Sequence, residues 1–132
     1  MQAINPPGWL RAPGWSHAML EKVGDRTYLK IAGQVGWDMT TQKLVSDDLE
    51  GQYDQALANL CTLVREAGGE PNNIIELRIY VTSVDEFNAK AKQLGQIYRN
   101  HLGKHFPAIT LLGVNQLFMK ELKIEIEALA II

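Results

Sequence analysis

The sequence has little cysteine, no excess of one charge and no long apolar run. Its 132 residues contain a single cysteine, Cys61, so no intrachain disulfide can form. The helical spacing of Cys61 from Leu57 and Val64 indicates a core thiol and not a nucleophile, which needs an exposed electropositive setting. The 13 basic and 15 acidic side chains are mixed along the chain and give a net charge of −2. A basic surface for nucleic acid is therefore not expected.

Long apolar segments are also missing. No stretch approaches the roughly 20 apolar residues of a transmembrane helix. The first residues include prolines and tryptophans where a signal peptide has a continuous apolar run. We therefore expect a cytoplasmic protein that has no membrane partner. The length suits one domain, residues 1–132, without repeats or linkers.

Alternating apolar residues predict four strands, near residues 28–35, 75–82, 108–117 and 122–131. In the first strand, the alternation places Gly33 on the same face as Leu29 and Ile31. The apolar face of the second strand consists of Ile75, Leu77, Ile79 and Val81.

Helical periodicity predicts two amphipathic helices between these strands. The first begins at Asp47, which has a glutamate three residues later, and ends at the glycine pair that starts with Gly68. The second begins at Ser83 in the same capping pattern and runs to Gly103.

The predicted fold class is α+β, a mixed β-sheet with two helices packed on one face. The opposite face of the sheet would be too apolar for solvent alone, which indicates an oligomer. Its side chains are Tyr28, Ala32, Tyr80, Thr110, Leu112 and Val114.

Four segments resemble a known family in order and spacing: Ala32-Gly33-Gln34, Arg78-Ile79-Tyr80-Val81, Phe106-Pro107-Ala108-Ile109-Thr110 and Lys123-Ile124-Glu125-Ile126-Glu127-Ala128. The family is the Rid family, the YjgF-type enamine and imine deaminases, and the resemblance extends from about Pro13 to Ala130. It implies a subunit similar to the bacillary chorismate mutase fold. It also implies a homotrimer with small-molecule clefts between neighbouring subunits and no cofactor.

The chain departs from the family pattern at Ile109. The deaminating members have an arginine there, which binds the substrate carboxylate, and Thr110 replaces their serine. Arg78 could bind the ligand carboxylate in place of the arginine that is missing at position 109. Its side chain is predicted to point away from the helices, and its planar guanidinium suits bidentate pairing. The structural alternative, which we favour, is an ion pair between Arg78 and a neighbouring glutamate.

The resemblance assigns Glu125 as the catalytic residue, because it matches the glutamate that positions the hydrolytic water. A carboxylate near an apolar cleft can have a raised pKa and exchange protons with water and an imine nitrogen. The alternative is a cross-strand ion pair. Gly33 matches a position where the backbone approaches the ligand, and Trp15 and Trp37 are candidate cleft walls, although a tryptophan is more often core.

A metal site is not expected. His101 and His105 are four residues apart, but Gly103 between them and Pro107 beyond interrupt the helix that would align them. His17 is a candidate for the edge of the cleft, but we expect it to face water.

Three functions remain open from the sequence. The first is cofactor-independent hydrolysis of a reactive enamine or imine, with a non-standard substrate preference because of Ile109. The second is a trimer that binds a metabolite without turnover. The third is a related hydrolase of a catabolic pathway. The ribonuclease label given to some family members has no support in the residues of this chain.

Overall fold

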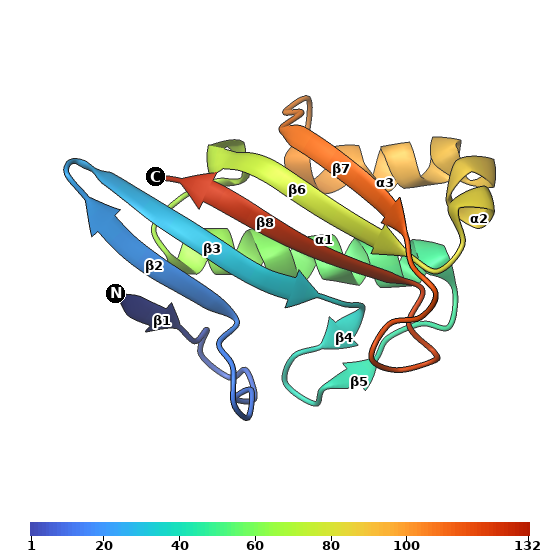
Figure 1. Cartoon of the computed structure of the whole chain (residues 1–132), viewed down its shortest axis with the longest axis horizontal. Helices are drawn as coiled ribbons and strands as arrows, with labels where there is room; N and C mark the ends of the chain where they lie inside the picture. The colour runs from blue at the N-terminus through green and yellow to red at the C-terminus, as the bar shows by residue number, and fades with distance from the viewer.

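The computed structural model describes all residues from 1 to 132, and its centre is a six-stranded mixed sheet (Figure 1). The strands lie in the order β1 (Gln2–Ile4), β2 (Ala18–Val23), β3 (Arg26–Gln34), β8 (Ile124–Ile131), β6 (Ile74–Val81) and β7 (Ala108–Gly113). Only the β6–β7 pair is parallel. A small hairpin of β4 (Trp37–Asp38) and β5 (Lys43–Leu44) follows the end of β3.

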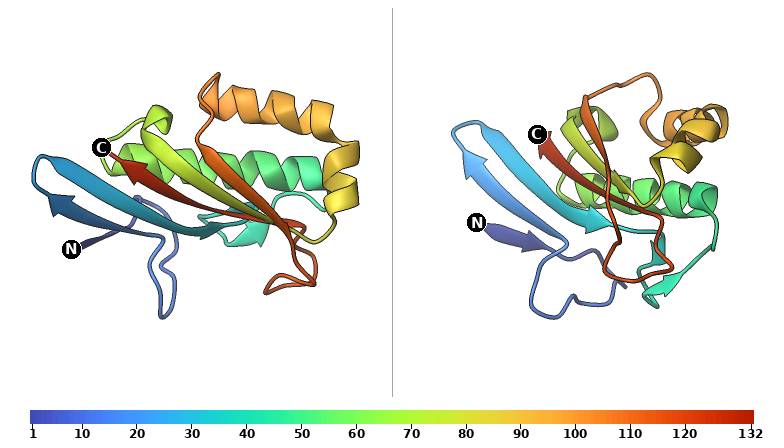
Figure 2. Two further views of the ribbon diagram at one scale, coloured as in Figure 1. Left: turned by 45° about the horizontal axis from the view of Figure 1, so that its top comes forward. Right: turned by 45° about the vertical axis from the view of Figure 1, so that its right-hand side comes forward.

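The helices all cover one face of this sheet (Figure 2). They are α1 (Leu49–Glu66), the short 3-10 helix η1 (Pro71–Asn73), α2 (Val84–Ala89) and α3 (Ala91–Leu102). The predicted α+β class is confirmed. The second predicted helix is interrupted at Lys90, whose φ of −104° and ψ of 17° leave the helical range, so the sheet carries three α-helices and not two. No helix is long and apolar enough to span a membrane.

The core lies between the helices and the sheet and contains 23 buried apolar residues. The helix α1 contributes a continuous buried stripe, and β8 contributes every second residue from Ile124 to Ala130. Each fully buried leucine or isoleucine contributes about 1.5–3 kcal/mol through the removal of its surface from water. Cys61 belongs to this core, as predicted, and burial raises the pKa of its thiol to about 11.

The ends of the helices follow the expected capping chemistry, with one shift. The N-cap of α1 is Asp48 and not Asp47, because the Asp48 carboxylate accepts a hydrogen bond of 2.7 Å from the Gly51 amide. Gly68 ends this helix with a φ of +91°, as predicted. The Ser83 hydroxyl accepts from the Glu86 amide at 3.1 Å, as predicted for α2.

Two irregularities in the sheet overturn the simple alternation. The pairing of β6 with β8 shifts between Ile74 and Glu76, so Ile74 is buried and Ile75, which was predicted to face the helices, is exposed. The pairing of β3 with β8 shifts between Ile31 and Gln34. This bulge buries Gln34 and turns Gly33 away from the face of Leu29, contrary to the predicted pattern.

The first two strands were not predicted. β2 forms a regular hairpin with β3, closed by a turn at Gly24 whose φ is +64°. The apolar residues of β2 are interrupted by Glu21 and Lys22, so no clear alternation marks it. β1 has only three residues, too few for a periodic signal.

Candidate functional site

A cavity with a volume of about 360 Å³ lies beside the last residues of β3. Four parts of the chain form its wall: the N-terminal segment before β2, the end of β3 with the β4–β5 hairpin, the loop before β8, and β8 itself. The lining residues are Pro13, Trp15, Ala32, Gly33, Gln34, Val35, Trp37, Met39, Gln42, Phe118 and Glu125. Most are apolar, and Glu125 is the only charged one.

Gly33 and Glu125 meet inside this cavity. A β-carbon at position 33 would lie 2.0 Å from Oε1 of Glu125 and 2.7 Å from its Cδ. No side chain fits there while the carboxylate keeps its place. The close contact between Gly33 and the Glu125 side chain occurs at the bulge in β3, where the register with β8 shifts between Ile31 and Gln34. The absence of a side chain at Gly33 thus leaves the space that the Glu125 carboxylate occupies.

The Glu125 carboxylate makes no hydrogen bond and no ion pair with another group of the chain. Burial raises its pKa above the ordinary glutamate value, and the negative charge of Glu127 raises the pKa further. A carboxyl group with a raised pKa and free oxygens can exchange protons with a bound molecule at a pH closer to neutral.

Glu127 lies two residues along the same strand and has the opposite electrostatic setting. Burial would raise its pKa, but hydrogen bonds from Lys30 and Tyr80 and the nearby positive charges outweigh burial, so the pKa of Glu127 is lowered. The Lys30 Nζ lies 2.5 Å from Glu127 Oε2, and the Tyr80 hydroxyl donates to Oε1. Glu127 therefore stays ionised and keeps a fixed negative charge beside Glu125.

Aromatic rings form two walls of the cavity. Trp37 packs edge-on against Phe118 with ring centroids 5.5 Å apart. Trp15 and Trp9 both pack edge-on against His17, with ring centroids 4.9 and 5.1 Å away. His17 is only 1% exposed, so the expectation that it faces water is wrong. The ring contacts both tryptophans, and its Nε2 lies 3.2 Å from the Leu10 carbonyl oxygen, so it packs inside the N-terminal segment.

The sequence-predicted site residues divide into two groups. Glu125, Gly33, Trp15 and Trp37 line the same cavity. Arg78, Thr110 and Ile109 do not line it.

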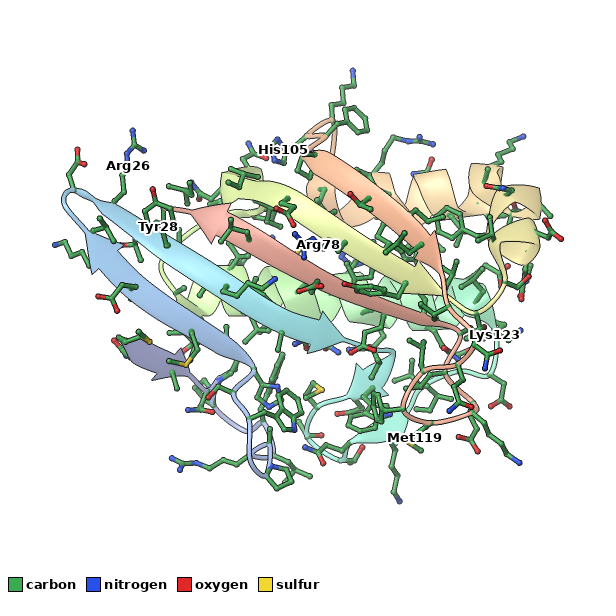
Figure 3. All side chains as sticks on the ribbon, viewed as in Figure 1. Arg26, Tyr28, Arg78, His105, Met119 and Lys123 are labelled. Atoms are coloured by element: carbon green, nitrogen blue, oxygen red, sulfur yellow. The ribbon has the colours of Figure 1, made fainter.

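Arg78 projects from the sheet face that is turned away from the helices (Figure 3). Its Nε lies 2.7 Å from Glu76 Oε1, which is the kind of ion pair named above as the structural alternative. Thr110 is paired with Arg78 in the strand register and is exposed on β7. Ile109 is paired with Leu77, and it lines a separate groove beside α3. A single chain therefore keeps position 109 apart from Glu125.

Several cavity residues were missed from the sequence, and two had a usable signal. Phe118 lies between Leu117 and Met119 in the loop before β8 and is exposed, and large apolar residues in an exposed loop are a usable signal, because binding residues are often on loops. Gln34 belongs to the family-like segment, but its burial depends on the bulge. Gln42 has a φ of +55°, which is unusual for glutamine, and no sequence pattern predicts that conformation.

The histidines considered for a metal have other partners. His101 Nε2 lies 2.6 Å from Asp54 Oδ1, and His105 Nε2 donates to the Ile74 carbonyl at 2.7 Å. No group of three or more histidine, cysteine, aspartate or glutamate side chains gathers in a metal-binding arrangement.

The fold and the cavity together describe a small α+β domain with a mostly apolar cavity beside the end of β3. The family model described as Endoribonuclease L-PSP matches residues 11–132. The chain therefore belongs to this family, the Rid or YjgF family, as its sequence motifs predicted.

Relatives and solved structures agree with this assignment. The human protein named 2-iminobutanoate/2-iminopropanoate deaminase is 33% identical over 125 residues, which are 92% of this chain and 85% of that protein. A RutC family protein of Pyrococcus horikoshii is 31% identical over 103 residues, 78% of each chain. The crystal structure of RidA from an Antarctic Psychrobacter species matches with a TM-score of 0.81 at 26% identity and covers 100% of both chains.

Proposed function

We propose that this protein hydrolyses a reactive imine or enamine to a carbonyl compound and ammonia, without a cofactor, in the Glu125 cavity. The observation that carries the proposal is an unpaired carboxylate with a raised pKa in an apolar cavity, held against Gly33. The human relative is named as a deaminase of two small imino acids, which supports the same reaction class for this chain.

The proposed reaction needs only one proton-transfer group. Water adds to the C=N carbon while the Glu125 carboxylate takes a proton from that water and passes it to the nitrogen. Glu125 then takes the hydroxyl proton of the carbinolamine and delivers it to the nitrogen, so that the C=O bond forms as the C–N bond breaks and ammonia leaves with the electron pair of that bond. The net change is imine plus water to carbonyl plus ammonia, so Glu125 returns to its starting state.

An enamine needs one step more. Protonation at its β-carbon by the protonated form of Glu125 gives the iminium ion, and the Glu125 carboxylate then takes one N–H proton back as the neutral imine forms. The raised pKa of Glu125 brings its protonated form closer to neutral pH, which suits a group that gives and takes a proton in one cycle.

The cavity wall indicates the substrate class. It contains tryptophan, methionine and phenylalanine side chains and two glutamines, but no lysine or arginine. An imine with an apolar body and no second charge fits this lining better than the imine of a simple amino acid. The same lack of cations disfavours an RNA backbone, whose phosphates need positive partners.

We also propose that three copies assemble with the ligand cleft between neighbours. Large apolar side chains remain exposed on the sheet and its edge strand, among them Tyr28, Ile109 and Leu112. Ile109 and Thr110 do not reach the Glu125 cavity of their own chain, so they can contact its ligand only from a neighbouring copy. Light scattering at micromolar concentration tests this assembly, and a monomeric mass would contradict it.

The test of the activity is a panel of freshly generated imines, with ammonia and carbonyl measured together. The panel pairs an apolar uncharged imine with an amino-acid-derived imine of the same size. The proposal expects equal amounts of ammonia and carbonyl from the uncharged imine and a lower kcat/KM for the charged one. Binding of imines without any acceleration over buffer would leave a metabolite-binding protein instead.

A further inference from the structure

One side-chain amide in the wall of the Glu125 cavity has no partner in the chain. Two lining residues, Gln34 and Gln42, carry such amides. The Gln34 amide nitrogen donates to the Ala32 carbonyl at 3.0 Å, and the residue is only 2% exposed. The Gln42 side chain makes no hydrogen bond within the chain, and its polar atoms are not enclosed. Gln42 therefore keeps both a donor and an acceptor for a bound molecule.

The turn between β4 and β5 holds Gln42 in an unusual backbone conformation. The Gln42 backbone amide donates to the Asp38 carbonyl at 2.7 Å, and the Thr40 hydroxyl donates to the Asp38 carboxylate at 2.7 Å. The φ of Gln42 is +55°, in the left-handed region that glycine adopts without strain and glutamine rarely adopts. A glycine would satisfy this turn, so the backbone alone gives no reason for a glutamine. A free amide at the cavity wall gives one.

Gln42 lies at the boundary between two neighbouring depressions. It lines the Glu125 cavity and also an adjoining depression of about 240 Å³, and Trp37 lines both. A ligand that reaches Glu125 and Gln42 therefore has its reacting carbon at one and a polar group at the other, with apolar side chains between. In the proposed trimer, Ile109 and Thr110 of a neighbouring copy approach the same ligand and add no charge.

We propose that Gln42 selects imines that carry a carboxamide in place of a carboxylate. The carboxamide oxygen accepts from Gln42 Nε2, and a carboxamide N–H donates to Oε1, so the two amides pair through two parallel hydrogen bonds. A carboxylate has no donor for Oε1, and the cavity wall offers its charge a second carboxylate and no cation. The inference rests on the proposed imine hydrolysis and names its substrate class. Gln42 is then a specificity-determining residue and takes no part in proton transfer.

Titration with three non-reacting probes, followed by nuclear magnetic resonance of the isotope-labelled protein, tests this role. Butanamide, 2-pentanone and butanoate have nearly the same size and differ in the polar end. Butanamide should shift the side-chain amide signals of Gln42 in a saturable way. It should bind about fivefold more tightly than 2-pentanone, which lacks the donor for Oε1. Butanoate should bind more weakly than butanamide.

Substitutions at position 42 separate recognition from a purely structural role. Gln42→Met keeps the length of the side chain without the amide, so the preference for butanamide over 2-pentanone should disappear. Gln42→Gly should lose the same preference and have a melting temperature at least equal to that of the wild type, because glycine adopts the left-handed φ without strain. Gln93→Met is the matched control, since Gln93 is exposed on α3 outside the cavity, and it should keep the wild-type preference.

Four results would each overturn the proposal: an unchanged preference in Gln42→Met, an equal loss in Gln93→Met, tighter binding of butanoate than of butanamide, or no saturation with butanamide. Because no turnover is measured, failure of this test leaves the imine hydrolysis untouched. The hydrolysis is decided by ammonia and carbonyl release, which these binding probes do not produce.

Discussion

The Glu125 cavity and the groove that contains Ile109 are both mostly apolar, but within one chain they share no residue. The cavity holds a carboxylate without a partner, whereas the groove has no carboxylate. A carboxylate in an apolar wall suits proton transfer, because burial raises its pKa. In the proposed trimer, the groove side of one chain brings Ile109 to the ligand of a neighbouring cavity. The cavity therefore supplies the reacting group and the groove only a contact to the ligand, and the substitutions below test that division.

Gly33→Ala should have the largest effect on the cavity. The new β-carbon would lie 2.0 Å from Glu125 Oε1, so the carboxylate must move. A displacement of about 1 Å at a reacting group can lower the rate roughly 100-fold. We expect kcat/KM for an uncharged imine to fall by about that factor.

Gly95→Ala is its matched control in the groove. The β-carbon there meets only Arg99 Nη1 at 3.4 Å, an ordinary contact. Imine turnover should stay at the wild-type level, and the free energy of unfolding should rise by about 0.5–1 kcal/mol because Gly95 lies inside α3. An equal loss of turnover in both glycine variants would contradict this division of roles.

Ile109→Arg should add a cation at the position where the resemblance implies an arginine in the deaminating members, and in the proposed trimer a neighbouring copy brings this position to the ligand of the Glu125 cavity. An extra charged hydrogen bond of about 1.5 kcal/mol corresponds to roughly a tenfold gain. We therefore expect kcat/KM for an amino-acid-derived imine to rise about tenfold. Ile109→Met, which keeps the volume without the charge, should show no gain. If the arginine variant is folded and also shows none, position 109 does not reach the reacting ligand.

Glu127→Gln should change the pH dependence of the reaction. The Glu127 charge raises the pKa of Glu125, so its removal lowers that pKa. Because the carboxylate form takes the proton from water, the acid limb of kcat/KM should move to lower pH. Glu76→Gln is the control, since its charge is neutralised by Arg78. An unshifted acid limb in Glu127→Gln would exclude this coupling between the two glutamates.

The smallest effect that we expect is on stability. Glu125→Gln should raise the melting temperature slightly. The pKa of Glu125 is raised in the folded state, so its favourable contribution is present below the unfolded pKa and is lost as pH rises through the folded pKa. At a pH above the folded pKa, the partly buried negative charge of Glu125 destabilises the folded state, and the neutral amide of the variant avoids this penalty. The melting temperature of the variant should therefore exceed that of the wild type by roughly a few degrees at pH 8 and match it at pH 4.

Much of the fold could be predicted from the sequence, because its helices and inner strands have strong periodicity. The capping serine of α2 and the glycines after α1 marked helix boundaries within one or two residues. The short edge strand β1, the polar strand β2 and the break at Lys90 could not be predicted, because pairing and packing determine them. The bulges were also hidden, since Ile74 and Ile75 are chemically alike.

The candidate site was predictable only in part. The family motif gave Glu125 and Gly33, but the contact between them depends on the bulge in β3. Arg78 was considered as the replacement for the missing arginine because strand alternation correctly turned it away from the helices. Alternation does not give its distance to Glu76. The place of Gln42 in the cavity wall depends on the left-handed turn between β4 and β5, which no sequence pattern predicts.

Ammonia release by Glu125→Gln from an apolar uncharged imine tests the central claim most directly. The account predicts that the wild type releases one ammonia for each carbonyl formed and that the variant, folded and with unchanged imine binding, is slower by about 100-fold or more. Glu121→Gln, an exposed glutamate outside the cavity, should match the wild type. Wild-type rates in Glu125→Gln would contradict the claim that this carboxylate performs the proton transfer.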